Sequence, residues 1–100
     1  MDKAKKFELM NKVVRELEDL QNSQTALITK IGQIEVDNMN GLNDKRLETD
    51  LGDMHSKIAQ NVDAITEIFA YFEAQRDEFA NANRSAIEAA EAAAAADAVK

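Results

Sequence analysis

Cysteine, proline and tryptophan are absent from this chain of 100 residues, and glycine occurs only three times. The lack of cysteine excludes disulfides, thiolate metal ligands and thiol nucleophiles. The lack of proline, with so little glycine, leaves few residues that interrupt a helix. Ala, Leu, Glu, Lys and Gln are abundant instead, which is typical of helical proteins. The composition therefore predicts the all-α class.

Positive charge and long apolar runs are also scarce. Twelve basic residues stand against 19 acidic ones, so the net charge is -7, which disfavours nucleic acid phosphates and anionic membrane surfaces as partners. No segment approaches the roughly 18 apolar residues of a membrane span, and the first ten residues lack the apolar core of a signal peptide. We expect a soluble chain that binds neither nucleic acid nor membrane and is cytoplasmic or virion-associated.

Two stripes of mostly apolar residues recur at alternating steps of three and four, the spacing of a coiled-coil seam. The first comprises Met10, Val13, Leu17, Leu20, Gln24, Leu27, Ile31 and Ile34. The second comprises Leu51, Met54, Ile58, Asn61, Ile65, Ile68, Phe72, Gln75 and Phe79. From these stripes the sequence predicts that the core and its register depend on Ile31, Ile34, Ile58, Ile65, Ile68 and Phe72, with Gln24 and Asn61.

The stripes are separated by residues 38–44, which contain a helix stop and a helix start. Gly41 suits the left-handed position that ends a helix, and Asn43 suits the N-cap of the next one. At the beginning of the chain, Asp2 can cap the first helix. The sequence predicts a hairpin over residues 1–84, with helices 2–40 and 44–84 joined by a turn at 41–43.

An antiparallel arrangement brings the two stripes into register. It pairs Ile34 with Leu51 and Leu20 with Ile65, and the midpoint of such pairs falls within the predicted turn. The same register places Gln24 opposite Asn61, so the two polar residues of the stripes can form a hydrogen bond.

Residues 85–100 form an Ala-rich extension of the second helix and have no partner in the first helix by this register. Two interpretations remain open: an exposed helical tail, or a docking helix whose small side chains let another helix approach closely. Aromatic residues near the end of the hairpin exceed the needs of one seam. The candidate interaction surface therefore comprises Phe69, Tyr71, Phe79, Ala86, Ala89, Ala90 and Ala93.

The segment 58–65 has Ile at the a position and Asn61 at the d position. It resembles the asparagine core layers of trimeric fibre proteins from phages and bacterial surface adhesins. That resemblance implies, as an alternative fold, a parallel trimeric coiled-coil fibre segment.

An acidic, cysteine-free chain of about this length, with Gly41 in the turn of a helical hairpin, is also similar to the WXG100 proteins exported by type VII secretion. That resemblance implies a secreted helical hairpin. The turn has Met39 where the family has its defining Trp, and Tyr71 is followed four residues later by Gln75 rather than by the acidic residue of the export signal.

No residue pattern predicts catalysis, and we expect no catalytic residue, no cofactor and no metal. His55 is the only histidine, and it lies beside the seam. Two helices alone bury little apolar surface, so we expect an oligomer or a larger assembly. The predicted function is a non-enzymatic structural or assembly protein that acts through helix–helix contacts, with a phage virion or assembly component as its setting. The alternative is an acidic inhibitor or adaptor that binds a basic protein surface through Glu16, Glu18, Asp19, Asp63 and Glu67.

Overall fold

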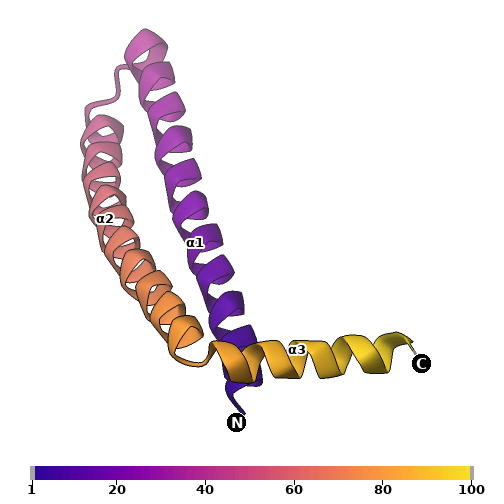
Figure 1. The fold of residues 1–100 in the computed structure, drawn as a ribbon. Coiled ribbons are helices and arrows are strands. Elements are labelled where there is room, and N and C mark those ends of the chain that lie inside the picture. The colour runs from indigo at the N-terminus through magenta and orange to yellow at the C-terminus, as the bar shows by residue number, and fades with distance from the viewer. Residues whose placement is uncertain (1, 100) are drawn as a thin grey trace. The chain divides into compact units, whose positions relative to one another are not determined.

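The computed structural model describes residues 2–99 and is helical over nearly all of them (Figure 1). Helix α1 spans Lys3–Asp37, a short π-helical segment η1 spans Asn38–Leu42, α2 spans Lys45–Ala82, and α3 spans Arg84–Val99. No β-strand occurs between residues 2 and 99. The predicted all-α class is therefore confirmed.

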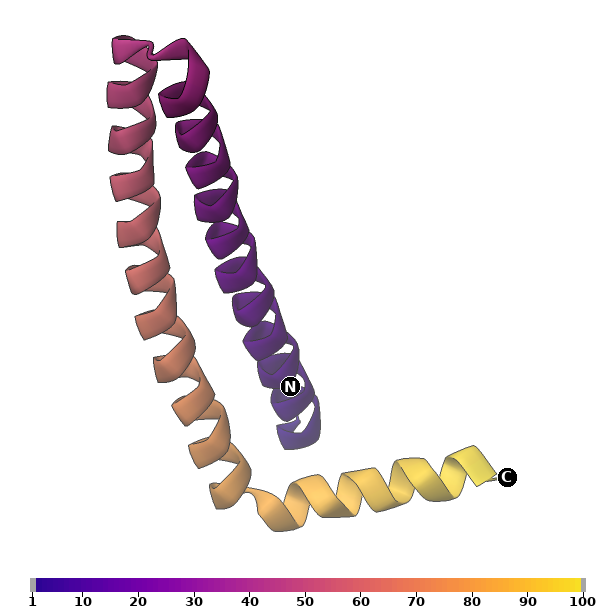
Figure 2. The same cartoon turned by 90° about the horizontal axis from the view of Figure 1, so that it is seen from above.

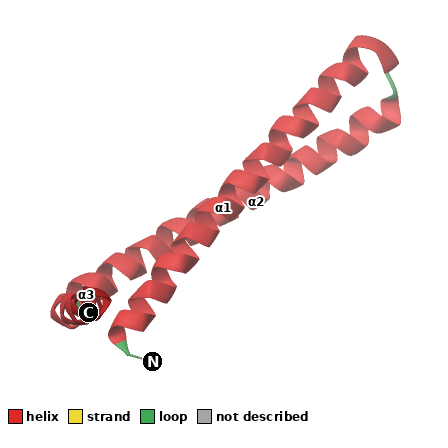
Figure 3. Cartoon of the chain, turned by 90° about the vertical axis from the view of Figure 1, so that its right-hand side faces the viewer, coloured by secondary structure: helices red, strands yellow, loops and turns green. Residues whose placement is uncertain are grey.

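The chain divides into two compact units. Unit 1 comprises Met1–Glu16 with Phe69–Lys100, and unit 2 comprises Leu17–Ile68. In unit 2, Gln21 contacts Thr66 and Glu35 contacts His55, so a later residue of α1 contacts an earlier residue of α2. The helices of unit 2 are thus antiparallel, as Figure 3 also shows on both sides of the connection between α1 and α2. The predicted hairpin is confirmed, and a parallel fibre is not the arrangement within the chain.

Side chains near the helix starts and within the helices satisfy backbone and hydroxyl groups. The Lys5 backbone N–H donates to Asp2 Oδ1 at 2.8 Å, so Asp2 caps α1 as predicted. Five hydroxyl groups donate to the carbonyl four residues earlier, which accommodates polar residues inside long helices. These residues are Ser23, Thr25, Thr29, Thr49 and Thr66.

The turn is built differently from the prediction. Asn43 adopts the left-handed conformation with φ of 51°, whereas no glycine among the described residues has a positive φ, so Gly41 is not the helix stop. Gly41 lies inside η1, and the helix continues as a π turn until Asn43, whose short polar side chain tolerates the left-handed region. Asp44, not Asn43, caps the next helix, because its Oδ1 accepts the Leu47 backbone N–H at 2.9 Å.

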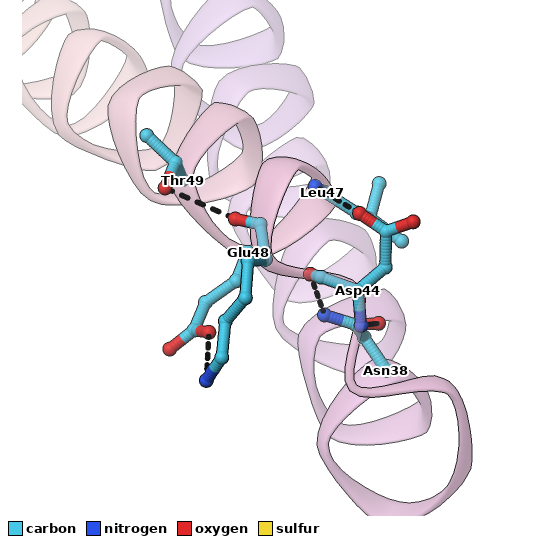
Figure 4. Close-up of polar contacts among 6 residues, drawn as sticks. Asn38, Asp44, Leu47, Glu48 and Thr49 are labelled. Carbon is cyan, nitrogen blue, oxygen red and sulfur yellow. Dashed lines mark hydrogen bonds and ion pairs between the residues drawn. The ribbon is translucent and has the colours of Figure 1, made fainter.

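Asn38 holds the two sides of the turn together (Figure 4). Its Oδ1 accepts the Asp44 backbone N–H at 3.0 Å, and its Nδ2 donates to the Asp44 carbonyl oxygen at 3.1 Å. It is the one polar residue within residues 2–99 that is buried, with 4% of its surface exposed. The Asn43 backbone N–H also donates to the Asn38 carbonyl oxygen at 2.7 Å, so Asn38 joins the two sides of the turn through both its side chain and its backbone.

In unit 2, alternate residues of each predicted stripe face the other helix, and the residues between them are exposed. Gln24, Ile31, Ile58 and Ile65 are half-buried or buried, as predicted. Exposed, and hence wrongly assigned to the core, are Ile34, Asn61 and Ile68. Their places are taken by the residues that follow them in the sequence, Glu35, Val62 and Phe69, and a step of one residue turns a helix by about 100°. Phe72, in unit 1, is half-buried.

In unit 1, the Ala-rich segment is a separate helix and not an extension of α2. The chain turns sharply between α2 and α3 at Asn83, whose Nδ2 donates to the Phe79 carbonyl oxygen at 2.9 Å (Figure 2). The buried Ile87 of α3 shares a groove with Ala4 and Phe7 of α1. The expectation that this segment has no partner in the first helix is therefore wrong for its first turns, because the sharp turn redirects the chain.

Candidate interaction surface

One side of the helix pair in unit 2 is polar. Gln21 Nε2 donates to Thr66 Oγ1 at 2.7 Å, and His55 Nδ1 lies 3.2 Å from Glu35 Oε1. The latter contact is an ion pair when the imidazole is protonated. Gln21, Glu35 and His55 are half-buried and face the other helix. Thr66 is exposed and directly follows the buried Ile65. These contacts occupy the only histidine and fix the rotation of α1 against α2.

The opposite side of the pair is apolar. Seen along the axis of the pair, the chain winds clockwise in one antiparallel helix and anticlockwise in the other. The residue that precedes an inward-facing residue therefore lies on the same side of the pair in both helices, opposite the polar side. We call this surface the apolar face, and it consists of Leu20, Leu27 and Ile34 from α1 with Met54 and Ile68 from α2.

Each member of the apolar face is substantially exposed. The exposed fractions are 45% for Leu20, 46% for Leu27, 39% for Ile34, 51% for Met54 and 52% for Ile68. The spacing of seven residues on each helix places the side chains in two parallel rows. Asn61 occupies the middle of the α2 row and is also exposed. Scattered exposed apolar residues are ordinary, whereas aligned rows of this kind mark contact surfaces.

Charged residues border the apolar face. Lys30 and Asp37 each follow a member of the α1 row by three residues, and Lys57 follows Met54 by three, so they are neighbours on the helix surface. Asp50 precedes Met54 by four residues and pairs with Arg46 at 3.4 Å. All four border residues are exposed. The surface thus has an apolar centre and a charged rim, as protein interfaces do.

The aromatic residues of the predicted surface are only partly available for contacts. Phe69 and Phe79 are half-buried, and Lys6 Nζ lies 5.0 Å from the centroid of the Phe79 ring. Arg76 of the same segment donates to Asn11 Oδ1 at 3.2 Å. Only Tyr71 is largely exposed, at 65%.

The alanines of the predicted surface divide in the same way. Ala90 is half-buried in the groove with Ile87, while Ala86, Ala89 and Ala93 are exposed. The first part of α3 is therefore used for packing within unit 1. Small exposed side chains alone provide little area for a further partner.

The sequence alone does not distinguish the apolar face from the core, because the residues of the face also fit the predicted seam. A signal is present in two apolar doublets, Leu27-Ile28 and Ile68-Phe69, whose first members lie on the apolar face. Two consecutive helical residues lie about 100° apart and cannot both face one neighbour. Such doublets therefore indicate a second contact face.

Between residues 2 and 99, no three His, Asp or Glu side chains are grouped closely enough to hold a metal ion. The helices of that part include none with the length and apolarity needed to cross a membrane.

No protein-family model matches the chain, and neither a curated protein nor a solved structure shows significant similarity to it.

Proposed function

We propose that this protein is a non-enzymatic structural or assembly protein that acts through helix–helix contacts with other chains. The observation that carries the proposal is the apolar face of unit 2, whose five side chains remain about half exposed. Completing the burial of each would stabilise an assembly by roughly 1 kcal/mol per side chain. Aligned apolar rows of this kind mark surfaces that contact another chain.

The small core of the chain supports the same proposal. Within residues 2–97, the buried apolar side chains are Val14, Ile31, Ile65 and Ile87, and no large side chain is completely enclosed. Chains with so little buried apolar surface commonly depend on association for stability. The setting that we propose is a phage virion or assembly component, since helices with polar residues at heptad positions and an Ala-rich end suit repeated helix contacts.

The mass of the protein in solution tests this proposal. We expect sedimentation equilibrium to give a mass above that of one chain, 11.1 kDa. Leu27→Asp places a charge in the centre of the apolar face and should reduce the mass to that of one chain while the helical circular dichroism persists. A single-chain mass for the unmodified protein at all concentrations would refute the proposal.

Val36→Asp is the matched control. Val36 is on the same helix, is apolar and is 50% exposed, but it lies outside the apolar face. We expect this variant to retain the mass of the unmodified protein. If both variants dissociate, the effect comes from charge on α1 in general, and the apolar face is not the contact surface.

A further inference from the structure

We propose that the apolar face binds the apolar face of a second copy of this chain, and that the two copies run antiparallel. In this arrangement the turns of the two copies lie at opposite ends, each α1 contacts the other α1, and each α2 contacts the other α2. Asn61 of one copy meets Asn61 of the other at the two-fold axis. The inference rests on the proposed function and adds the partner and its orientation.

The exposed area is sufficient for such a contact. A folded monomer of this mass exposes about 5,700 Å² by the usual scaling of surface with mass. This chain exposes 7361 Å². The excess of about 1,700 Å² per chain exceeds the roughly 800 Å² that each partner contributes to a stable interface. The chain as a whole therefore exposes more surface than a contact with a second copy needs.

The apolar face is symmetric about its middle. Gln21 contacts Thr66 and Glu35 contacts His55. Leu27 lies about midway between the two contact residues of α1, and Asn61 lies about midway between those of α2. These two residues are therefore nearly level.

A two-fold axis through this level makes the rows of the two copies complementary. It pairs Leu20 with Ile34 of the second copy, and Met54 with Ile68 of the second copy. Leu27 and Asn61 each meet their own counterpart. Every large apolar side chain of one face then contacts an apolar side chain of the other, as an isologous interface requires.

Asn61 is the residue that favours a second copy over an unrelated helix. A side-chain amide has both donors and acceptors, so an identical amide satisfies it when the two meet at a symmetry axis. An unrelated apolar helix would bury Asn61 without a partner, which is unfavourable. A polar residue within an apolar row also selects one alignment among several.

The charged rim favours the antiparallel orientation. If the turns of both copies lay at the same end, α1 would contact α2 of the other copy. Lys30 would then lie near Lys57, and Asp37 near Asp50, on both edges of the interface. With the turns at opposite ends, Lys30 lies beside Ser23 and Lys57 beside Ala64 of the second copy, so the lysines are separated. Asp50 lies beside Tyr71, and Asp37 beside Glu16, so one kind of like-charge contact remains where the other orientation has two.

Disulfide mapping tests the arrangement, because the chain contains no cysteine. Leu27→Cys and Asn61→Cys are prepared as single variants, mixed, equilibrated in a glutathione redox buffer and analysed by peptide mass spectrometry. We expect disulfides joining position 27 to position 27 and position 61 to position 61. Val36→Cys, outside the face, should form no such dimer.

The outcomes separate this inference from the proposed function. A predominant disulfide between positions 27 and 61 would overturn the antiparallel orientation in favour of copies with their turns together. An assembled mass with no disulfide at either position would overturn the apolar face as the contact between copies, while the proposed function would stand. A single-chain mass for the unmodified protein would overturn both.

Discussion

Among single residues, those of the turn have the least replaceable conformations. Asn43 adopts a left-handed backbone, and Asp44 caps the helix that follows. Asn38 is buried, and both Oδ1 and Nδ2 of its side-chain amide form hydrogen bonds. Gly41, which the sequence indicates as the special residue, adopts no positive φ. The polar side chains of this segment, and not the freedom of glycine, therefore determine its path.

Gly41→Ala should stabilise the protein by about 0.4–1 kcal/mol, because alanine restricts the unfolded chain and suits a helical backbone. A Cβ atom at Gly41 would meet no other atom within 4 Å. Urea unfolding followed by circular dichroism measures the change. Asn43→Ala provides the contrast, since alanine in the left-handed region should be destabilising. A destabilised Gly41→Ala variant would show that Gly41 requires the left-handed conformation after all.

Among the helices, α1 and α2 each have more apolar positions than one seam can use. In unit 2, the predicted stripes and the observed inward positions share Leu17, Gln24 and Ile31 on α1 and Leu51, Ile58 and Ile65 on α2. They differ at the six stripe positions that are exposed, which are Leu20, Leu27, Ile34, Met54, Asn61 and Ile68. The predicted alternative, with Leu20, Leu27 and Ile34, is the more apolar of the two on α1, so hydrophobicity alone selects it. The observed rotation of α1 instead turns Gln21, Ile28 and Glu35 inward, and Gln21 then contacts Thr66 while Glu35 contacts His55.

Helix α3 depends on one large side chain. Ile87 is 6% exposed, whereas residues 91–97 are exposed. Ile87→Ala should weaken the docking of α3 by about 2 kcal/mol or more. Hydrogen exchange should then accelerate at residues 84–97 and remain unchanged at residues 45–66. Leu9→Ala, which removes a 47% exposed side chain in the same unit, is the control and should leave α3 protected. Equal acceleration in both variants would contradict the role of Ile87.

For the whole molecule, stability and association are expected to be linked. Burial between copies stabilises the folded chain by mass action, so the melting temperature should rise with protein concentration.

Asn61→Leu should raise the affinity between copies, since it removes a polar residue from an apolar row, and it should also weaken the preference for one orientation. Sedimentation measures the first effect, and disulfide mapping with a Leu27→Cys second substitution measures the other. Unchanged affinity in Asn61→Leu would indicate that Asn61 lies outside the contact.

The amino-acid sequence was sufficient for the helices, the position of the turn, the cap at Asp2 and the antiparallel pairing, since each follows from local periodicity or from neighbours within a few residues. It was not sufficient for the rotation of α1 against α2, for the left-handed residue or for the direction of α3. Leu27 and Ile28 differ by about 100° around one helix, and the choice between them depends on contacts such as that of Glu35 with His55, which lie far apart in the sequence. In the tertiary structure Ile28 faces the other helix and Leu27 does not, and the same rotation leaves the apolar face exposed.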